Sequence, residues 1–495
     1  MIIAHDLGTT GDKASLVDSE GRVRASLSRS YATTFGPGGT AEQDPQDWWQ
    51  SVSAATRGLL AETGIPAHRI EAISFSGQMM GAVLVDEAGD PVRPAIIWAD
   101  TRSGRQSEQL IARFGLEQAY AITGHRLNPT YTLSKVMWVR DEEPQAFSRA
   151  RRVLQAKDFI VHRLTGRMLT DPSDASSTNA FDQTASIWST DLIAAAELNL
   201  ALFPEIVPST QVVGTVTGAA AAYTGLAEGT PVVIGGGDGP MAALGAGVLD
   251  PGDGGYAYLG TSSWVSIATS RPLHDPAMQT MTFNHVVPGA FVPTATMQTG
   301  GGALEWLREV LDPGELTSFG QLLSAMAGVQ AATDGLFFLP YLLGERSPYW
   351  NPQARAAFIG LCRHHTQAHL TRAVVEGVAF NLRTGLLAFA SNGTAITRVD
   401  AIGGAAASGA VLQILADVWG VPVASRDLAA EANALGAAVV GGVGVGMFGD
   451  LTVARSLSRR QQDVRPDMRL HSDYTGGYQR FVDAYRRLES WFASS

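Results

Sequence analysis

The sequence predicts an α/β protein built from two similar domains, and three observations support this. The chain has 495 residues, more than a single hydrophobic core usually supports. Stretches rich in β-forming residues alternate with amphipathic helical patterns along the chain. The bend Leu7–Thr10, LGTT, also recurs about half a chain later as Leu259–Ser262, LGTS, each between two strand-like runs. A repeat at that distance indicates two domains and not a solenoid, whose repeats are much shorter.

Composition limits the classes of function. The formal net charge of −11 argues against general binding of nucleic acids or anionic membranes, because either needs a clustered basic face. Cys362 is the one cysteine, so no internal disulfide can form, as is typical of a reducing cytoplasm. The longest uncharged apolar run, 434–448, is shorter than a membrane span of about 20 residues. The chain opens directly in a strand-like run, so we expect a cytoplasmic protein without a signal peptide.

The first hairpin, residues 2–18, has the composition of a phosphate-binding turn. Two runs of β-forming residues flank a bend of Gly and Thr, with Asp6 before the bend and Lys13 after it. Glycines let backbone N–H groups approach phosphate oxygens, Thr9 and Thr10 add hydroxyl donors, and Lys13 adds a compact positive charge. Asp6, where the first strand ends, is suited to hold a hydrated Mg²⁺ above those phosphates. An ordinary N-terminal hairpin with a tight turn fits these residues equally well.

The second hairpin, residues 256–267, repeats this bend in the other half of the chain. Gly260 and Thr261 lie in its turn. Two such bends that face each other across a cleft can hold one polyphosphate between them. Lysine occurs only three times in the chain, and the lysine of the first hairpin is the best phosphate contact. Lys135 and Lys157 fall in helical patterns, where a solvated or packing role is expected.

Local signals predict the remaining elements of the first half. Asp44 and Pro45 are the N-cap and first residue of an amphipathic helix that extends to about residue 63. The segment 102–202 is largely helical in pattern and suits a substrate-enclosing insertion. The predicted strands are 23–30, 70–76, 82–86, 94–98 and 231–234, the predicted helices are 45–63, 103–115, 131–141, 151–165 and 241–246, and 33–44 is a Gly- and Pro-rich loop.

Two strand ends of the first half carry candidate substrate contacts. Ligands of open α/β sheets bind at the carboxyl ends of strands, so Gln78, Met79 and Met80 form a candidate pocket wall. Adjacent methionines are also common core filler. Asp100 and Arg102 follow another predicted strand, where they can hydrogen-bond the hydroxyls of a polyol or form a structural ion pair. The residues alone leave both alternatives open.

Asp238 is the candidate general base. It follows the strand 231–234 and three glycines, which remove every side chain that would block access to the carboxylate. Pro240 suits the first position of the next helix and makes Gly239 its cap, which leaves the Asp238 carboxylate without that duty. A capping or turn role for Asp238 is the competing interpretation.

The second half begins after a boundary at residues 248–255, which is rich in Asp, Gly and Pro. Gly301 lies where glycines lead into a helix, and a helix N-terminus is a candidate nucleotide contact. Gly404, Ala405 and Ser408 follow the strand 399–402, where backbone nearly free of side chains leaves room for adenine. Helices are predicted at 303–310, 369–390, 409–419 and 478–492, with a buried, closely packed helix within 434–448, while Cys362, His364, His365 and His369 fit a solvated helix start better than a metal site.

Together these motifs resemble the FGGY carbohydrate kinases, a family within the actin-like, sugar-kinase and chaperone-ATPase superfamily. Residues 132–142, TLSKVMWVRDE, are similar to the first family signature, with Thr130 departing from its usual opening residue. Residues 356–376, AAFIGLCRHHTQAHLTRAVVE, match the second signature more fully. The resemblance runs from residue 2 to about residue 445 and includes, in one order, DLGTTGDK, SGQMMG, WADTR, GGGDG, YLGTSS and GGAAAS.

The resemblance implies that MgATP phosphorylates a hydroxyl of a sugar or polyol. Two actin-like (ribonuclease H-like) ATPase domains would close over a central cleft. Asp238 matches the catalytic base that takes the proton from the attacking hydroxyl, and Asp6 matches the position near Mg²⁺ and the γ-phosphate. Met79 and Met80 match the pair that contacts xylulose. The implied phosphate and adenosine contacts are Thr9, Thr10, Lys13, Gly260, Thr261, Gly404, Ala405 and Ser408.

Within the family, the chain most resembles the xylulokinases, and this resemblance implies D-xylulose as the substrate. Xylulokinases usually have Met-His where this chain has Met79-Met80, and an Asn after the base where this chain has Gly239. Both changes delete hydrogen-bonding groups, which weakens the transfer of a substrate preference. Gluconokinases carry Asp-Gly at the base position, so gluconate or another open-chain sugar acid or polyol is the alternative substrate.

The implied organisation has three parts: an N-terminal sugar-binding domain, 1–249, a C-terminal nucleotide-binding domain, 250–446, and a helical extension, 447–495. A rival from another class is an ATP-gated binding protein like actin or the chaperone ATPases, which would hydrolyse ATP without sugar. The expected ligands are ATP, Mg²⁺ and a small sugar or polyol, with neither nucleic acid nor membrane as a partner. Association into a homodimer stays open.

Overall fold

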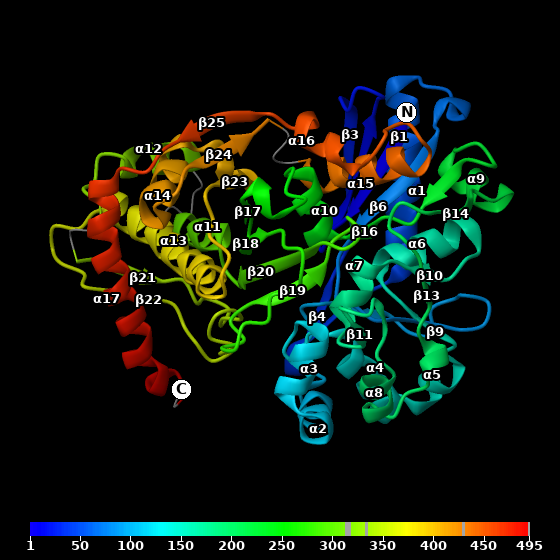
Figure 1. Cartoon of the computed structure of the whole chain (residues 1–495), viewed down its shortest axis with the longest axis horizontal. Coiled ribbons are helices and arrows are strands. Elements are labelled where there is room, and N and C mark those ends of the chain that lie inside the picture. Colours follow the sequence, from blue (N-terminus) through cyan, green and yellow to red (C-terminus); the bar gives the residue numbers. More distant parts are fainter. Residues whose placement is uncertain (312–317, 332–334, 428–430, 494–495) are drawn as a thin grey trace.

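The structure is a computed structural model of the chain, and it describes residues 1–311, 318–331, 335–427 and 431–493. Figure 1 shows two lobes side by side, each built on a β-sheet with helices packed against it. The first lobe contains the sheet formed by strands from residues 2–237, and the second lobe contains the sheet formed by strands from residues 255–464. The prediction of two similar α/β domains is confirmed.

The first sheet has the strand order β14–β15–β6–β1–β2–β3, with β16 paired to β6. Its centre is β1, which pairs antiparallel with β2 and parallel with β6. This register sets Asp6 opposite Lys13 on one side and Ser76 on the other. The strands are β1 (Ile2–Leu7), β2 (Gly11–Val17), β3 (Val23–Ser30), β6 (Ala72–Gly77), β14 (Val212–Thr215), β15 (Pro231–Val233) and β16 (Gly236–Gly237).

The second sheet repeats this centre. Its order is β19–β20–β18–β17–β23–β24–β25, and β17 pairs antiparallel with β18 and parallel with β23. The two LGT bends therefore join equivalent strands, β1 to β2 and β17 to β18. The strands are β17 (Gly255–Leu259), β18 (Ser263–Ile267), β19 (Met281–Asn284), β20 (Phe291–Met297), β23 (Val399–Ile402), β24 (Val423–Arg426) and β25 (Arg460–Val464).

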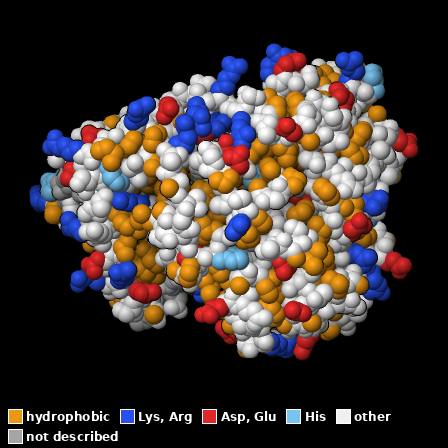
Figure 2. Space-filling model, viewed as in Figure 1, with side chains coloured by type: hydrophobic (Ala, Val, Ile, Leu, Met, Phe, Trp, Pro, Cys, Tyr) orange, Lys and Arg blue, Asp and Glu red, His pale blue; other side chains and the backbone are white. Residues whose placement is uncertain are grey.

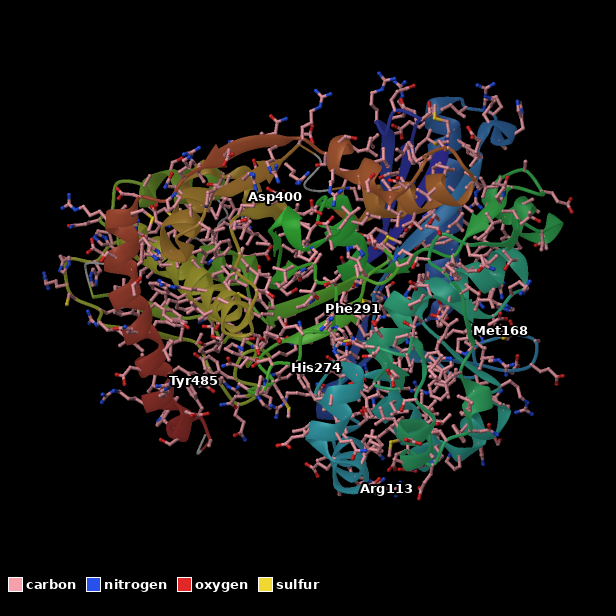
Figure 3. The ribbon with its side chains drawn as sticks, viewed as in Figure 1. Arg113, Met168, His274, Phe291, Asp400 and Tyr485 are labelled. Atoms are coloured by element: carbon pink, nitrogen blue, oxygen red, sulfur yellow. The ribbon has the colours of Figure 1, made fainter. Side chains whose placement is uncertain are left out.

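A buried carboxylate ties the last strand to the second sheet. Asp400 of β23 is fully buried and is labelled in Figure 3. It accepts hydrogen bonds from Arg426 of β24, whose Nε lies 3.1 Å away, and from Arg460 of β25, at 2.8 Å. Two guanidinium groups thus satisfy one buried charge, as burial requires. The C-terminal extension, expected to be helical, contributes this strand as well as helices.

Helix α1 (Pro45–Thr63) has the ends that its sequence predicts. Asp44 caps α1 by accepting from the N–H of Gln46, and Gly64 ends the helix in the left-handed conformation. The other α-helices are α2 (Gly104–Phe114), α3 (Leu116–Thr123), α4 (Thr132–Glu142), α5 (Pro144–Arg149), α6 (Ala156–Thr165), α7 (Pro172–Ala175), α8 (Thr190–Ala195), α9 (Gly218–Thr224), α10 (Asp238–Gly245), α11 (Gly301–Leu311), α12 (Phe319–Met326), α13 (Gln367–Ser391), α14 (Gly409–Trp419), α15 (Ala432–Gly444), α16 (Ala454–Leu457) and α17 (Met468–Phe492).

Three local predictions were wrong here. The last helix, expected over 478–492, begins at Met468, because Asp467 caps it there. The segment 33–44, expected as a loop, contains β4 (Thr34–Gly36) and β5 (Thr40–Gln43), because β5 finds a partner in β8 (Ala95–Ile96) far along the chain. The helix expected over 151–165 begins only at Ala156, because 152–154 form β9, which pairs with β7 (Val83–Val85). The remaining short strands are β10 (Leu169–Thr170), β11 (Phe181–Asp182), β12 (Ile187–Trp188), β13 (Glu205–Ile206), β21 (Phe337–Leu339) and β22 (Ala357–Ile359).

Helix α15 lies in the first lobe although it follows the strands of the second. It packs on β1 and β6 and crosses α10 closely (Figure 1). A Cβ at Gly436 would lie 2.3 Å from the carbonyl oxygen of Met241, and one at Gly245 would lie 1.9 Å from that of Ala432. Only glycine allows this approach, so the prediction of a buried, closely packed helix is confirmed. The chain therefore returns to the first lobe before it completes the second.

The lobes meet where α16 lies. Arg455 of α16 forms ion pairs with Asp250 and Asp253, which belong to the segment between the two sheets. Figure 2 shows basic and acidic side chains gathered together at the top of the molecule, over this junction. Helix α13 is long and apolar enough to pass a test for a membrane span, but 72% of its most apolar window is buried within the fold.

Candidate active site

A cavity of about 210 Å³ lies between the lobes and takes residues from both. The first hairpin contributes Asp6, Gly8 and Thr9, and the second contributes Tyr258, Ser262 and Trp264. The other lining residues are Met79, Met80, Trp98, Asp238, Gly239, Met281, Phe283, Thr294, Thr296, Arg346 and Asn433. Both bends and the candidate base therefore meet in one space.

Asp6 brings a carboxylate to this cavity from the end of β1. Ser76 donates to its Oδ1 at 2.8 Å, and Asn433 of α15 donates to the same oxygen at 3.1 Å. Burial raises the pKa of Asp6, and these two hydrogen bonds lower it less than burial raises it. Because both donors reach one oxygen, Oδ2 has no hydrogen bond from the described residues. That oxygen suits a cation or a bound water.

Asp238 lies at the start of α10 and not before it. The helix begins at this residue with Gly237 as its N-cap, so the expected start at Pro240 was wrong. Asp238 Oδ1 accepts from the N–H of Gly239 at 2.7 Å, and the carboxylate thus engages the first turn as well as the cavity. Burial, and then repulsion from Asp6, raises the pKa of Asp238 to about 7. A carboxylate with that pKa suits a general base near neutral pH.

A buried charge network holds the strand ends under Asp238. Lys157 is fully buried and forms ion pairs with Asp158, Asp171 and Asp174, which raise its pKa. Ser173 donates to Asp171 and accepts from the N–H of Gly237 at 3.0 Å, so the network reaches the residue before the base. Lys157 therefore packs and is not solvated.

Met80 has a strained backbone in the cavity wall. Its φ is 65°, a left-handed value that non-glycine residues rarely adopt. The buried Lys135 donates to its carbonyl oxygen at 2.9 Å, and its N–H donates to Ser177 Oγ at 3.1 Å. Burial lowers the pKa of Lys135 to about 7. Met79 and Met80 thus line the cavity with a fixed backbone, and Lys135 has a packing role.

Three predicted substrate contacts do not line the cavity. Gln78 is buried and donates to Gln43 Oε1 at 2.8 Å. Asp100 is fully buried, accepts from the N–H of Ala41, and forms an ion pair with Arg102. The structural ion pair, one of the two alternatives for Asp100 and Arg102, is the arrangement that the structure contains.

The three predicted phosphate contacts of the first hairpin differ in their position relative to the cavity. Thr9 lines the cavity, and its Oγ1 accepts from Trp98 Nε1 at 2.8 Å. Thr10 is exposed at the bend. Lys13 lies outside the cavity lining, forms an ion pair of 2.9 Å with Glu431, and lowers the pKa of Asp6 through its charge.

A larger cavity of about 720 Å³ adjoins the second hairpin. It contains all six residues predicted to contact the nucleotide from the second half, namely Gly260, Thr261, Gly301, Gly404, Ala405 and Ser408. The bend 260–262 borders both cavities, because Ser262 lines the smaller one and the two preceding residues, Gly260 and Thr261, line the larger one. A nucleotide in the larger cavity can therefore point its phosphates past this bend towards Asp6 and Asp238.

Sequence reasoning did not assign several lining residues that bear polar groups, among them Asn433, Trp98, Tyr258 and Arg346. Asn433 and Trp98 hydrogen-bond Asp6 and Thr9, respectively. Tyr258, the first residue of the YLGTSS motif, lies beside both carboxylates. Arg346 faces Asp238 from the other lobe. One signal for Arg346 was available, a lone cation in the aromatic- and Pro-containing segment 344–350.

The two carboxylates fit a divalent cation bound together with phosphates. Asp6 and Asp238 share the cavity, and burial raises the pKa of each. No group of three or more His, Cys, Asp or Glu suited to a metal occurs in the described part of the chain. Mg²⁺ commonly uses one or two carboxylates and completes its shell with water and substrate phosphates, so this sparse set suits it.

Comparisons with known proteins agree with this geometry. A model of the FGGY family of carbohydrate kinases, N-terminal domain, matches residues 1–245, and the C-terminal domain model matches residues 255–445. A xylulose kinase of Bacillus subtilis (strain 168) is 33% identical over 450 residues, which cover 91% of this chain and 89% of that protein. A gluconokinase of the same strain is 30% identical over 454 residues, which cover 89% and 86%.

Among solved structures, a ligand-bound xylulose kinase from Lactobacillus acidophilus is similar with a TM-score of 0.93 at 25% identity, covering 100% of this chain and 99% of that chain. The similarity thus extends over both lobes, the cleft and the C-terminal elements. Matches to both domain models and to relatives over nearly the whole chain lead to one conclusion: the protein belongs to the FGGY family of carbohydrate kinases.

Proposed function

We propose that the protein transfers the γ-phosphoryl group of ATP to D-xylulose and forms D-xylulose 5-phosphate. The observation that carries the proposal is the meeting of Asp238, Asp6 and the first LGT bend in one cavity that adjoins a larger, glycine-lined one. The choice of D-xylulose is supported by relatives named xylulose kinase that match most of this chain. The limits 1–249 and 250–446 are part of the proposal, with the sugar bound by the first segment and the nucleotide by the second, although α15 of the second segment packs in the first lobe.

In the proposed reaction, Asp238 orients the attacking hydroxyl and accepts its proton. The sugar oxygen forms a bond to the γ-phosphorus while the bond from that phosphorus to the leaving ADP oxygen breaks in line with it. Thr9 and Lys13, with the bend at Gly260 and Thr261, hold the phosphates and balance the charge that develops on them. Closure of the lobes excludes water, which would otherwise waste ATP.

Asp6 is the residue that would hold Mg²⁺, through water. When bound, the ion neutralises charge on the β- and γ-phosphates. Burial, and then repulsion from Asp6, raises the pKa of Asp238, which makes this carboxylate a stronger acceptor for the hydroxyl proton. We also place the protein in the cytoplasm, where ATP and open-chain sugars are available, and leave a homodimer as a proposal for the assembly.

Gluconate is the second candidate acceptor. The chain has Gly239 and Met80 where xylulokinases usually have hydrogen-bonding side chains, and a gluconokinase is 30% identical over 454 residues. An ATP-gated binding protein is a weaker rival, because it needs no second cavity between the bends.

The test is a coupled ADP-release assay of the full chain against pentuloses, hexuloses, polyols and aldonates. We expect the highest kcat/KM with D-xylulose and ATP consumption that depends on the sugar. Asp238→Asn should lower kcat by about 10²- to 10⁴-fold while the protein stays folded. A preference for gluconate would replace the substrate, and ATP hydrolysis that no sugar accelerates would contradict the kinase assignment.

A further inference from the structure

Arg346 is a cation of the second lobe that reaches the cavity between the lobes. It lines the cavity with Asp238, and its Cζ lies 5.3 Å from the ring centroid of Trp98. Its Nε has no contact with solvent and no hydrogen-bond partner. Within the described residues, the guanidinium forms no ion pair with a carboxylate. Protein atoms enclose this Nε, so a molecule in the cavity would meet the two Nη groups, which form no hydrogen bond with the described residues and can donate to it.

The hydrogen bonds of the neighbouring Glu345 hold the backbone of Arg346 in place. The preceding residue, Glu345, is buried, and its Oε1 accepts from the N–H of Arg346 and from the N–H of Gln298, each at 2.8 Å. Its Oε2 accepts from Asn381 of α13 at 2.9 Å. The start of the Arg346 side chain is therefore held in place before any ligand binds, which lowers the entropy cost of binding.

The two cations near the cavity serve different ends of it. Lys13 lies opposite Asp6 on the phosphate hairpin and lowers the pKa of that carboxylate. Arg346 lowers the pKa of Asp238, and its charge also acts on Tyr131. Asp238 is the group that meets the acceptor hydroxyl, so Arg346 lies at the acceptor end. The side chains of Met79 and Met80 beside it offer no hydrogen-bond donor.

We propose that Arg346 binds the acceptor and selects it, by donating to two adjacent oxygens of an open-chain carbohydrate, the carbonyl of a ketose and a neighbouring hydroxyl. A planar guanidinium presents donors in a fixed fork, which suits two neighbouring acceptors better than a point charge does. The carbonyl oxygen can only accept, so it complements a group that can only donate. This inference rests on the proposed function, because it takes the acceptor to be a ketose.

The test combines a protein change with a substrate change. Arg346→Met keeps the stem and removes the fork, Arg346→Lys keeps the charge, and xylitol replaces the carbonyl of xylulose with a hydroxyl. We expect Arg346→Met to raise KM for D-xylulose by about 10- to 100-fold, with KM for ATP unchanged. The preference of the wild type for D-xylulose over xylitol should shrink towards one in Arg346→Met, and Arg346→Lys should restore little of it.

Arg383 offers a matched control. Its guanidinium also lies over a ring, 5.0 Å from the centroid of Tyr478, it has an unpartnered Nη1, and it lines neither cavity. Arg383→Met should lower Tm as much as Arg346→Met and leave both KM values unchanged. The inference fails if Arg346→Met leaves KM for D-xylulose and the preference unchanged, or raises KM for ATP instead, which would assign the group to the phosphates.

The wild type separates this failure from failure of the proposed function. If it uses gluconate and not D-xylulose, the ketose proposal is wrong, and the same comparison is made with gluconate and glucitol, where loss of the carboxylate replaces loss of the carbonyl. If Arg346→Met then raised KM for gluconate but not for glucitol, Arg346 would still be a residue that binds the acceptor. Equal rises of KM for gluconate and glucitol would overturn that role.

Discussion

The two LGT hairpins have the same fold and different chemistry. In the first, Asp6 is paired with Lys13 across β1 and β2. In the second, Tyr258 is paired with Trp264 across β17 and β18, and their rings stack with centroids 4.1 Å apart. The first hairpin therefore supplies charge to the site, while the second supplies an aromatic surface. We propose that the two hairpins have different roles in the reaction.

The bends are also held in different ways. In the first, the carbonyl of Thr9 accepts from the Gln43 side chain at 2.6 Å. In the second, the carbonyl of Gly260 accepts from the N–H of Gly301 at 2.7 Å, and that of Thr261 accepts from the next N–H of α11 at 3.1 Å. The first bend thus depends on side chains and the second on the glycine backbone that opens α11.

The largest difference is expected on removal of the charge from the first hairpin. Asp6→Asn keeps the oxygen that accepts from Ser76 but removes the negative charge, so kcat should fall by about 10²- to 10³-fold. Tyr258→Phe, at the equivalent position, should change kcat by less than about threefold, because it removes no charge. Steady-state ADP release at saturating substrates measures both. Similar losses in the two variants would remove the proposed division of roles.

Variants of Lys13 and Trp264 compare the two hairpins by their effects on KM. Lys13→Met should raise KM for ATP by about tenfold, because it removes a cation beside the phosphates. Trp264→Phe should raise KM for the acceptor and leave KM for ATP unchanged. Glu431→Gln controls for loss of the ion pair that Lys13 forms. If Glu431→Gln reproduces the Lys13 effect, the lysine acts through that pair and not on the nucleotide.

Gly301→Ala tests the backbone support of the second bend. Its Cβ would lie 2.7 Å from the carbonyl oxygen of Gly260, so α11 or the bend must shift. We expect KM for ATP to rise several-fold and the free energy of unfolding to fall by about 1–3 kcal/mol. Gly104→Ala is the control, because Gly104 also lies at a helix start but has open space around it. It should change neither KM for ATP, measured by steady-state kinetics, nor the free energy of unfolding, measured by thermal unfolding.

The smallest expected effect is a shift of the pH profile. Asp238 must be ionised to accept a proton, and its pKa is about 7, so kcat/KM for the acceptor should rise with pH through about 7 and then level. Repulsion from Asp6 contributes to that raised pKa, so the residual activity of Asp6→Asn should titrate at lower pH. A midpoint that stays in place, or moves upward, would show that the two carboxylates do not interact.

Much of this architecture was predictable because its signals are local. The LGT bends lie directly between β-forming runs, and Asp44 with Pro45 marks a helix start within two residues. The strand β5 was not predictable, because its partner β8 lies about fifty residues further on and its own sequence is that of a loop. Pairing across such distances leaves no periodicity in the segment itself.

The candidate site likewise contains residues that local sequence predicts and residues that only the folded chain brings together. Asp6 and Asp238 are strand-end carboxylates, and the sequence predicts them from their neighbours. Asp100 and Arg102 carry the same signal, yet Asp100 accepts from the N–H of Ala41, which only the folded chain brings near. Arg346 was missed because a lone cation in the segment 344–350 is a weak signal, and only the folded chain brings it near Asp238 of the other lobe.

The position of α15 affects how the lobes can move and separate. Because this helix packs on β1 and β6 while β25 returns to the second sheet, the chain passes between the lobes three times: between β16 and β17, between β24 and α15, and between α16 and β25. Such a triple connection permits rocking about the junction near Arg455 and resists twisting or sliding. A single protease cut near Asp250 should therefore leave the two halves of the enzyme associated.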